Sequence, residues 1–365
     1  MKIINLPPEL LQVIVSLLSP KDICHVRETC SAIKDICDLE TVWAKLCFDH
    51  HSVRLPVKEQ FSPKAFYQKI LHKYAPAIGY WQQMDNGHHG GLLKVHFTES
   101  NTTIKIVKLE PDESDVRNDL IVKKWISITL NDGNVLIERE RESNELTLPE
   151  IVYCEKLSLP EISLVISLTN GSPFMRKSKI QRVLTPEWIR KYHGQHSSGS
   201  PQLNALAPGI FKGEYGGHGV ELIHLLDGQG VEVTGDDNVP FNKVTFRVTF
   251  GQKLDIPVEM QSNVNSLNEI TASNNVENYI VTHGDGEFEN DLHYDFIVPH
   301  SMYMEGDFTK DKCLGRWLGE AQIASTNYQN PSFIPAHFIL FNEDEFAVMF
   351  LELYLVSMYH RVKTL

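Results

Sequence analysis

The stretch from Pro208 to Glu221 gathers residue types that are suited to recognising a ligand. It holds five glycines within eleven residues, together with two aromatic residues, a lysine and His218. Glycine permits positive φ and lets a ligand or a second backbone segment approach closely. A phosphate cradle would need a following lysine or a helix start, and neither follows. Two interpretations stay open: a tight corner between two strands, and a recognition loop.

Side chains suited to acid–base chemistry lie in and after this stretch. Asp236 and Asp237, with His218 and His224, are the residue types of a proton-transfer site. Their spacing does not require such a site, because two aspartates before Asn238 are also an ordinary turn composition. A hydrolase built on these residues would lack a nucleophile, since the sequence contains no Gly-x-Ser-x-Gly elbow.

A metal site is not favoured by the histidines of the sequence. His88 and His89 are adjacent and point to different sides of an extended chain, while His96 lies on the strand that follows. A polar turn before a strand explains them without a metal. The sequence also lacks a Gly-x-x-x-x-Gly-Lys nucleotide loop and any Cys-x-x-Cys pair. We therefore expect no metal, no cofactor and no catalytic residue.

Composition limits the classes of partner. The chain has 365 residues and a net charge of −13, which argues against a basic nucleic-acid groove and against anionic membranes. Its six cysteines suggest no disulfide framework. Leu6-Pro7-Pro8-Glu9 interrupts any apolar run of a signal peptide, and the apolar segment from Phe346 to Met358 is too short to span a bilayer. We expect a soluble protein of the cytoplasm or the nucleus.

The elements that must position these side chains are short strands. After Pro76, alternation of apolar and polar residues replaces helical spacing, and turn residues separate the runs. The predicted strands are Gly91–Phe97, Ile104–Val107, Trp125–Leu130, Val135–Arg139, Leu164–Leu168, Val220–Leu226, Val231–Thr234, Val244–Phe250, His337–Phe341, Phe346–Tyr354 and Val356–Val362. Many short strands separated by turns predict an antiparallel β-barrel or sandwich.

The region before Pro76 is predicted to be helical. Between Ile4 and Phe48 the apolar spacing indicates three short helices: one capped by Asn5, one starting at Ser19-Pro20, and one around Trp43. A fourth helix opens at Ser62-Pro63 and is expected to join the helical head rigidly to the rest. The fold class is therefore α+β.

The domain boundaries follow from these patterns. We expect a helical domain at 1–50, a linker and helix at 51–76, and a β-rich domain at 77–365. One or two helical turns are predicted at 186–192. From Glu277 to Asp311 the sequence has nine acids and one basic residue, so the stretch near 262–312 is interpreted as a long, partly ordered insertion.

The helical head resembles an F-box. The F-box pattern begins Leu-Pro-x-Glu, continues through spaced leucines and isoleucines to Asp-Ile, and ends with a Val, a Cys and a Trp. The matching residues are Leu6, Pro7, Glu9, Leu10, Ile14, Leu18, Asp22, Ile23, Val26, Cys30 and Trp43. Ser31 departs from the basic residue often found after the Cys. Three short helices bury little surface alone, which fits a face that a partner covers.

The β-rich region is similar to the F-box only protein 31 family, which combines an F-box with a cyclin-D-binding domain. Pro208–Glu221 and the following Thr234–Pro240 look like that family's core signature. Three further segments resemble it in the same order: Trp81 with the Gly90–Leu93 run, Arg316–Ala324, and Phe338–Phe341 with the segment after it. The resemblance covers most of the chain from Trp81 onward, except Glu99–Leu206 and the acidic stretch.

This resemblance implies a non-catalytic substrate receptor of a Skp1–cullin–F-box ubiquitin ligase. The head would dock on Skp1, and through it on a cullin. The residues implied in Skp1 binding are Leu6, Pro7, Leu10, Ile14, Leu18, Ile23 and Val26. The β-rich domain would hold the C-terminal tail of a protein substrate. Members of the family are associated with cyclin D and with proteins whose C-terminus has become an amide.

A reader of C-terminal amides needs a particular chemistry. A pocket without a cation penalises a carboxylate by desolvation, whereas a neutral amide both donates and accepts hydrogen bonds. The substrate-binding residues proposed on the matching segments are Trp81, Tyr215, His218, Asp236 and Asn238. Three alternatives stay open: a small-molecule-binding barrel regulated through its F-box, a hydrolase site at His218, and an F-box protein that binds Skp1 without a ligase role.

Overall fold

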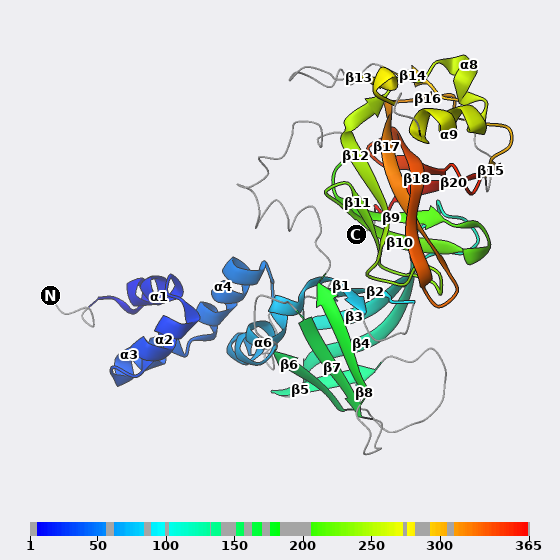
Figure 1. The fold of residues 1–365 in the computed structure, drawn as a ribbon. Helices are drawn as coiled ribbons and strands as arrows, with labels where there is room; N and C mark the ends of the chain where they lie inside the picture. The colour runs from blue at the N-terminus through cyan, green and yellow to red at the C-terminus, as the bar shows by residue number, and fades with distance from the viewer. Residues whose placement is uncertain are drawn as a thin grey trace. The chain divides into compact units, whose positions relative to one another are not determined.

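The computed structural model resolves the chain into helices, two large β-sheets and a small two-stranded sheet (Figure 1). It describes residues 6–55, 62–83, 89–98, 102–131, 133–139, 151–156, 163–169, 176–182, 206–272, 276–281, 293–304 and 310–363. The chain divides into two compact units. The first unit consists of Met1–Gly79, Leu93–Lys108 and Lys123–Ser178. The second, called the barrel unit below, consists of Tyr80–Leu92, Leu109–Val122 and Lys179–Leu365.

The head contains four helices rather than the three expected. They are α1 (Pro8–Ser16), α2 (Pro20–Arg27), α3 (Ser31–Cys37) and α4 (Glu40–His51). Ser19 caps α2 as predicted, by accepting a hydrogen bond from the Asp22 N–H. The expected second helix is broken because Thr29 Oγ1 donates to the Val26 carbonyl at 2.7 Å and Cys30 is extended. Pro7 precedes α1, and Asn5 lies outside the described residues.

The fourth predicted helix is confirmed, as three consecutive pieces. They are α5 (Pro63–Phe66), a π-helical turn (Tyr67–Leu71) and α6 (His72–Tyr74). The predicted start at Ser62 is also confirmed, since its hydroxyl accepts from the Ala65 N–H at 3.1 Å. The predicted helical turns at 186–192 lie outside the described residues.

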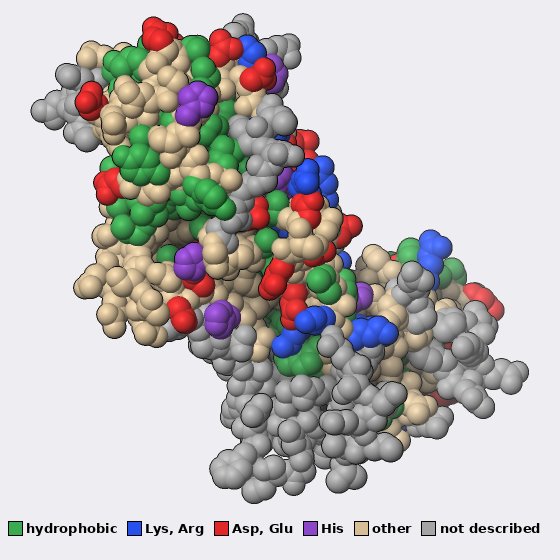
Figure 2. Space-filling model, turned by 90° about the vertical axis from the view of Figure 1, so that its right-hand side faces the viewer, with side chains coloured by type: hydrophobic (Ala, Val, Ile, Leu, Met, Phe, Trp, Pro, Cys, Tyr) green, Lys and Arg blue, Asp and Glu red, His purple; other side chains and the backbone are tan. Residues whose placement is uncertain are grey.

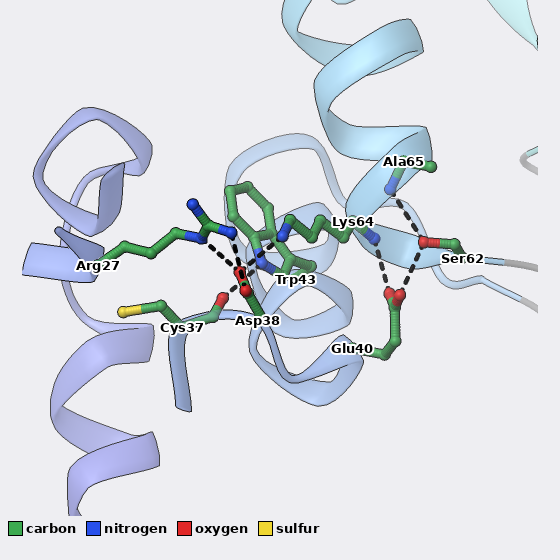
Figure 3. A network of polar contacts seen from close by, with 8 residues as sticks. All are labelled: Arg27, Cys37, Asp38, Glu40, Trp43, Ser62, Lys64 and Ala65. Atoms are coloured by element: carbon green, nitrogen blue, oxygen red, sulfur yellow. Dashed lines mark hydrogen bonds and ion pairs between the residues drawn. The ribbon is translucent and has the colours of Figure 1, made fainter. Parts of the chain in front are cut away.

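Polar contacts join α5 to the head (Figure 3). Asp38 Oδ1 accepts from Arg27 Nε at 2.7 Å and from Lys64 Nζ at 2.6 Å. Glu40 accepts from the Ser62 hydroxyl at 2.7 Å and from the Lys64 backbone N–H at 2.8 Å. These bonds connect α2, the α3–α4 loop, α4 and α5, so the head and the following helix hold one another in place.

The first β-sheet has eight strands in the order β5-β4-β3-β2-β1-β8-β7-β6. The strands are β1 (Gly79–Gln83), β2 (Leu92–Phe97), β3 (Thr103–Glu110), β4 (Ile121–Asn131), β5 (Asn134–Arg139), β6 (Ile151–Lys156), β7 (Ser163–Thr169) and β8 (Arg176–Arg182). The predicted β4–β5 hairpin is confirmed, with Leu130 opposite Val135 and Gly133 at φ +75.

The second assembly is a closed antiparallel barrel, which confirms the predicted architecture. Its eight strands pair in the order β11-β10-β9-β20-β19-β18-β17-β12, and β12 pairs again with β11. The strands are β9 (Gly209–Glu214), β10 (Val220–Leu226), β11 (Gln229–Glu232), β12 (Val244–Leu254), β17 (Gly315–Ser325), β18 (Gln329–Asn342), β19 (Glu345–Phe350) and β20 (Leu355–Arg361). Closure leaves no free sheet edge among these eight strands.

Large aromatic side chains fill the barrel. Phe246, Phe338, Phe346 and Tyr359 are each at most 2% exposed and belong to one core cluster with Trp317. The rings of Phe346 and Tyr359 stack with centroids 4.6 Å apart. Much of the barrel interior is therefore a packed core of the kind found in small barrels.

The acidic stretch near 262–312 contributes a small cap on the outer wall of the barrel. It holds α9 (Val264–Ala272), whose Val264, Leu267 and Ile270 are buried. The cap also includes α8 (Val258–Gln261), β13 (Ile280–Val281), β14 (Tyr294–Asp295), β15 (Tyr303–Met304) and β16 (Lys312–Cys313). Their apolar side chains pack with Ile339 and Met349 of the barrel wall. The asparagine and serine residues in and around α9 concealed its helical spacing.

The outer surface combines apolar and charged areas. Figure 2 shows hydrophobic side chains on the drawn face at the height of α8 and α9, with acidic side chains among them. In the barrel unit, exposed large hydrophobic residues include Tyr303, Leu353 and Tyr354. None of the helices that the structure describes is both long and apolar enough to cross a membrane.

Candidate functional site

The glycine-rich stretch forms the β9–β10 hairpin of the barrel. A short 3₁₀ turn at Gly216–His218 connects the strands, and Gly219 has φ +84. Gly213 lies against the ring of Tyr359, where a Cβ atom would come within 2.4 Å of a ring carbon. The corner interpretation therefore accounts for the glycines, while the polar side chains of the same hairpin enter the candidate site.

Two tyrosines and a threonine form a polar group beside the aromatic core. The Tyr359 hydroxyl donates to the Tyr215 hydroxyl at 2.7 Å, and Tyr215 Oη lies 3.2 Å from Thr245 Oγ1. The two tyrosine rings meet edge to face, with centroids 5.9 Å apart. Burial, followed by neighbouring charge, raises the pKa of both phenols well above the usual value. Both hydroxyls are therefore neutral donors and acceptors at physiological pH.

Glu221 and Glu232 bring two carboxyl groups into the barrel. Glu221 lies on β10 in phase with Ile223 and Leu225 of the core, and Glu232 ends β11. Their residues are 6% and 0% exposed. Burial, together with the charge of Asp236, raises the pKa of Glu221 to about 8. Burial and the proximity of Glu221 raise the pKa of Glu232 well above its usual range.

The acid pair is consequently neutral at pH 7. A carboxyl group without a charge presents an O–H donor and a C=O acceptor. Both carboxyl oxygens of Glu232 are buried and lack a hydrogen bond of normal geometry among the described residues. Buried polar atoms of this kind are costly unless a partner satisfies them. Glu221 and Thr245 are close enough to act on the Glu232 carboxyl by hydrogen bonding, so the pair forms part of a neutral polar cluster inside the barrel.

Asp236 and His218 lie close to this pair. Asp236 Oδ2 is 2.5 Å from His218 Nδ1, while Oδ1 accepts from the backbone N–H groups of Asn238 at 2.7 Å and Val239 at 2.6 Å. Asn238 Nδ2 donates to the Ala324 carbonyl at 2.7 Å. His218 is half exposed and the side chain of Asp236 is 19% exposed. The turn therefore places one solvent-accessible histidine, His218, beside the acid pair.

Trp81 lies apart from these residues. It belongs to β1, opposite Arg182 of β8, and is 2% exposed. The neighbouring Gln82 donates its amide to the carbonyls of Glu232 at 3.0 Å and Val233 at 3.3 Å. Because successive strand side chains point to opposite faces, Trp81 points away from β11. The structure thus gathers Tyr215, His218, Asp236 and Asn238, but not Trp81.

The other histidines do not assemble into the sites considered from sequence. His224 points to the face of β10 opposite Glu221, and His218 and Asp236 are the pair from the proposed acid–base site that the structure brings into contact. His89 Nδ1 lies 3.1 Å from the Gly235 carbonyl and helps to fix this turn. His88 lies outside the described residues. Within the described ranges, no three His, Cys, Asp or Glu side chains are placed to hold a metal ion.

The residues expected to bind Skp1 are divided between surface and core. Leu10 and Ile14 of α1 are 52% and 37% exposed, whereas Ile23 of α2 is fully buried within the head. Pro7 is exposed, and the side chains of Leu6, Leu18 and Val26 are partly exposed. The residues expected to bind Skp1 did not include Val13 of α1 or Leu17, which directly follows α1, although their side chains are 55% and 74% exposed. Helical spacing with Leu10 and Ile14 was the signal that would have included them.

Sequence reasoning also missed Glu232, Thr245 and Tyr359. They come from strands that are distant along the chain, and only barrel closure places them beside Tyr215. Glu221 could have been predicted to face inward, because it alternates in phase with the apolar residues Ile223 and Leu225 of β10.

Comparisons with known proteins agree with this domain order. A family model described as F-box-like matches residues 3–49, and one described as cyclin D1 binding domain matches residues 192–364. F-box only protein 31 of Rattus norvegicus is 24% identical over 444 residues, which cover 99% of this chain and 85% of the relative. The Homo sapiens protein of the same name is 23% identical, covering 99% and 83%. F-box only protein 31-A of Xenopus laevis is 24% identical, covering 98% and 84%. The chain thus joins an F-box-like domain to a cyclin D1 binding domain, and over nearly its whole length it is similar to proteins named F-box only protein 31.

Proposed function

We propose that this protein is the substrate-recognition subunit of a Skp1–cullin–F-box ubiquitin ligase. Its barrel unit binds the C-terminal tails of protein substrates and prefers tails that end in an amide. The protein performs no bond chemistry itself. It raises the local concentration of a substrate beside the ubiquitin-transferring enzyme.

The Skp1-binding part of the proposal is supported by α1. This nine-residue helix exposes Leu10, Val13 and Ile14, and its C-cap residue Leu17 is exposed as well, while Leu11 and Val15 face the head's core. Full burial of one such side chain stabilises a complex by about 1.5–3 kcal/mol. Apolar side chains on both the inner and the outer face of a short helix are typical of a helix whose outer face is covered by a partner. Ile23 supports this surface from within the head.

The amide preference rests on one observation, the neutral acid pair Glu221 and Glu232. A protonated carboxyl donates its O–H to the carbonyl of a primary amide and accepts an N–H from the same amide group. A C-terminal carboxylate offers no N–H, and it would lose its hydration beside two acids. The tyrosine hydroxyls of Tyr215 and Tyr359 extend the same neutral polar surface. His218 and Asp236 border it.

The test is binding of matched peptides that differ only at the C-terminus. The purified complex with Skp1 is titrated with an amide peptide and with its carboxylate form by calorimetry. We expect the amide peptide to bind at least tenfold more tightly. Glu232→Leu removes both the O–H donor and the C=O acceptor and reduces this preference, whereas Glu352→Leu makes the same change at an exposed acid and serves as the matched control. Equal affinities for both wild-type titrations would contradict the proposal.

The other functions make different predictions. A small-molecule carrier retains a ligand whose mass appears after native purification, although the aromatic core leaves little of the interior free. A hydrolase loses turnover in His218→Ala. A protein that binds Skp1 outside a ligase does not recover a cullin in the purified complex. Each result would replace the proposed receptor function with a named alternative.

A further inference from the structure

Arg316 is buried on the outer wall of the barrel. It lies on β17 opposite Ile339 of β18, on the face that the cap covers, while the adjacent Trp317 points into the barrel core. Arg316 is 4% exposed, and its Nη1 and Nη2 atoms make no hydrogen bond within the described ranges. Native proteins rarely leave a buried guanidinium without an anionic partner, because the loss of hydration is costly.

The surroundings of the guanidinium are mainly apolar. Its carbon atom lies 5.3 Å from the centroid of the Phe296 ring, and Cys313 and Leu254 belong to the same buried cluster. Burial lowers the pKa of Arg316 to about 10, so the group is still a cation at neutral pH. A fixed cation in a region of low polarity strengthens any pairing with an anion.

A pocket of about 270 Å³ reaches this cation. Its lining includes Arg316, Cys313, Ile256, Tyr294 and Asp255. Gln261 also lines the pocket, but its side chain is already hydrogen-bonded. Its Nε2 donates to the carbonyls of Ile256 at 2.8 Å and Asp295 at 3.1 Å, and its Oε1 accepts from the Ile297 N–H at 3.0 Å. The guanidinium of Arg316 is therefore the group in this pocket that still requires a partner.

We propose that the Arg316 pocket binds a carboxylate ligand. The two Nη atoms form parallel bonds with the two oxygens of one carboxylate. Asp255 and Asp295 in the lining add negative charge, which disfavours a phosphate dianion relative to a carboxylate. The volume accommodates a small organic acid or one acidic side chain of a bound protein. This site shares no residue with the acid pair inside the barrel.

Thermal and calorimetric titrations of the Skp1 complex test the proposal. All titrations are made at constant ionic strength. Succinate is compared with chloride. A peptide with blocked ends and one internal glutamate is compared with the same peptide carrying glutamine instead. We expect the carboxylate probes to stabilise the wild type and chloride to have no effect. Stronger binding of succinate identifies a small acid as the ligand, and stronger binding of the glutamate peptide identifies a protein side chain. No response to either probe overturns the proposal.

Variants separate the site from other sources of the effect. Arg316→Met keeps the volume and the apolar contacts, so it should fold with undiminished thermal stability and bind the carboxylate probe at least tenfold more weakly. Arg247→Met removes an exposed cation of the same barrel and should leave binding unchanged. Replacing Asp285, Glu287, Glu289 and Asp291 by amides should also leave it unchanged. Abolished stabilisation in this last variant would overturn the proposal, since the chain would then supply its own carboxylate.

The two proposals fail independently. Glu232→Leu is expected to reduce amide preference while leaving carboxylate binding at the Arg316 pocket intact. Arg316→Met is expected to do the reverse. Loss of both properties in either variant would contradict the separation of the two sites.

Discussion

Glu221 and Glu232 lie on the adjacent strands β10 and β11 with both carboxyl groups inside the barrel, where burial raises the pKa of both groups and the proximity of Glu221 raises that of Glu232 further. Two buried acids that do not ionise at pH 7 are unusual in a structural core. Their position beside Tyr215 and Tyr359 makes the barrel interior a neutral donor and acceptor surface. The receptor function proposed above depends on this relationship.

The acid pair should make stability depend on pH. Because the folded-state pKa of Glu221 is about 8, folded protein keeps a proton that unfolded chains have lost above pH 4.5. The free energy of unfolding should therefore fall as pH rises from about 4.5 to 8, by up to about 1.4 kcal/mol per pH unit for this group. Urea unfolding of the wild type and Glu221→Gln at pH 5 and pH 8 measures this. Equal pH slopes in the two proteins would show that Glu221 is ionised in the fold.

Asp38 should stabilise the head in the opposite direction. Its hydrogen bonds with Arg27 and Lys64 hold the pKa of this carboxyl below its usual range. The stabilisation is present above the ordinary pKa of an aspartate and is lost as pH falls through the folded-state value. Asp38→Asn should cost about 1 kcal/mol at pH 7, because both ion pairs are partly exposed, and less at pH 3. Asp35→Asn is the matched exposed control. An undiminished cost at pH 3 would contradict the ion-pair account.

The exposed face of α1 should determine Skp1 binding without determining the fold of the head. Leu17 is 74% exposed, so Leu17→Glu should leave the melting temperature unchanged and weaken Skp1 binding at least a hundredfold. Leu39→Glu introduces the same charge at an exposed leucine outside α1 and should bind normally. Calorimetric titration of Skp1 compares the variants. Similar affinities for both would place the interface elsewhere.

Ile23 should behave differently from Leu17 because it is fully buried. Ile23→Ala removes core methyl groups and should destabilise the head by about 2–4 kcal/mol. Its effect on Skp1 binding should then follow the fraction of folded protein, as measured by comparing unfolding curves with binding stoichiometry. A loss of affinity in fully folded Ile23→Ala would give this residue a direct role in the interface.

Gly213 should be required for the geometry of the substrate site. An added Cβ would meet the Tyr359 ring at 2.4 Å, so Gly213→Ala must displace the ring that bonds Tyr215. Overpacking of this kind costs about 1–3 kcal/mol. Gly217→Ala, in the same hairpin, meets no atom within 4 Å and should be neutral. Both variants are compared by thermal unfolding and by binding of the amide peptide. Equal stability and equal affinity of the two variants would show that Gly213 is not required for the geometry of the site.

The sequence predicted much of this architecture because local patterns carry it. The Ser19 cap and the Ser62 helix start are short-range signals, and the β4–β5 hairpin has a glycine turn between alternating runs. The break between α2 and α3 was missed because the apolar stripe continues across Thr29 and Cys30. The site was harder to predict. Tyr215 and Tyr359 are 144 residues apart, and barrel closure, which no local pattern encodes, brings their hydroxyls together.

The most direct test of the account is the affinity of the Skp1 complex for two peptides that differ only in a C-terminal amide or carboxylate. The account predicts at least tenfold tighter binding of the amide, with the difference reduced in Glu232→Leu and retained in Glu352→Leu. Equal binding of both peptides, or a preference for the carboxylate, would contradict the role of the neutral acid pair in tail recognition.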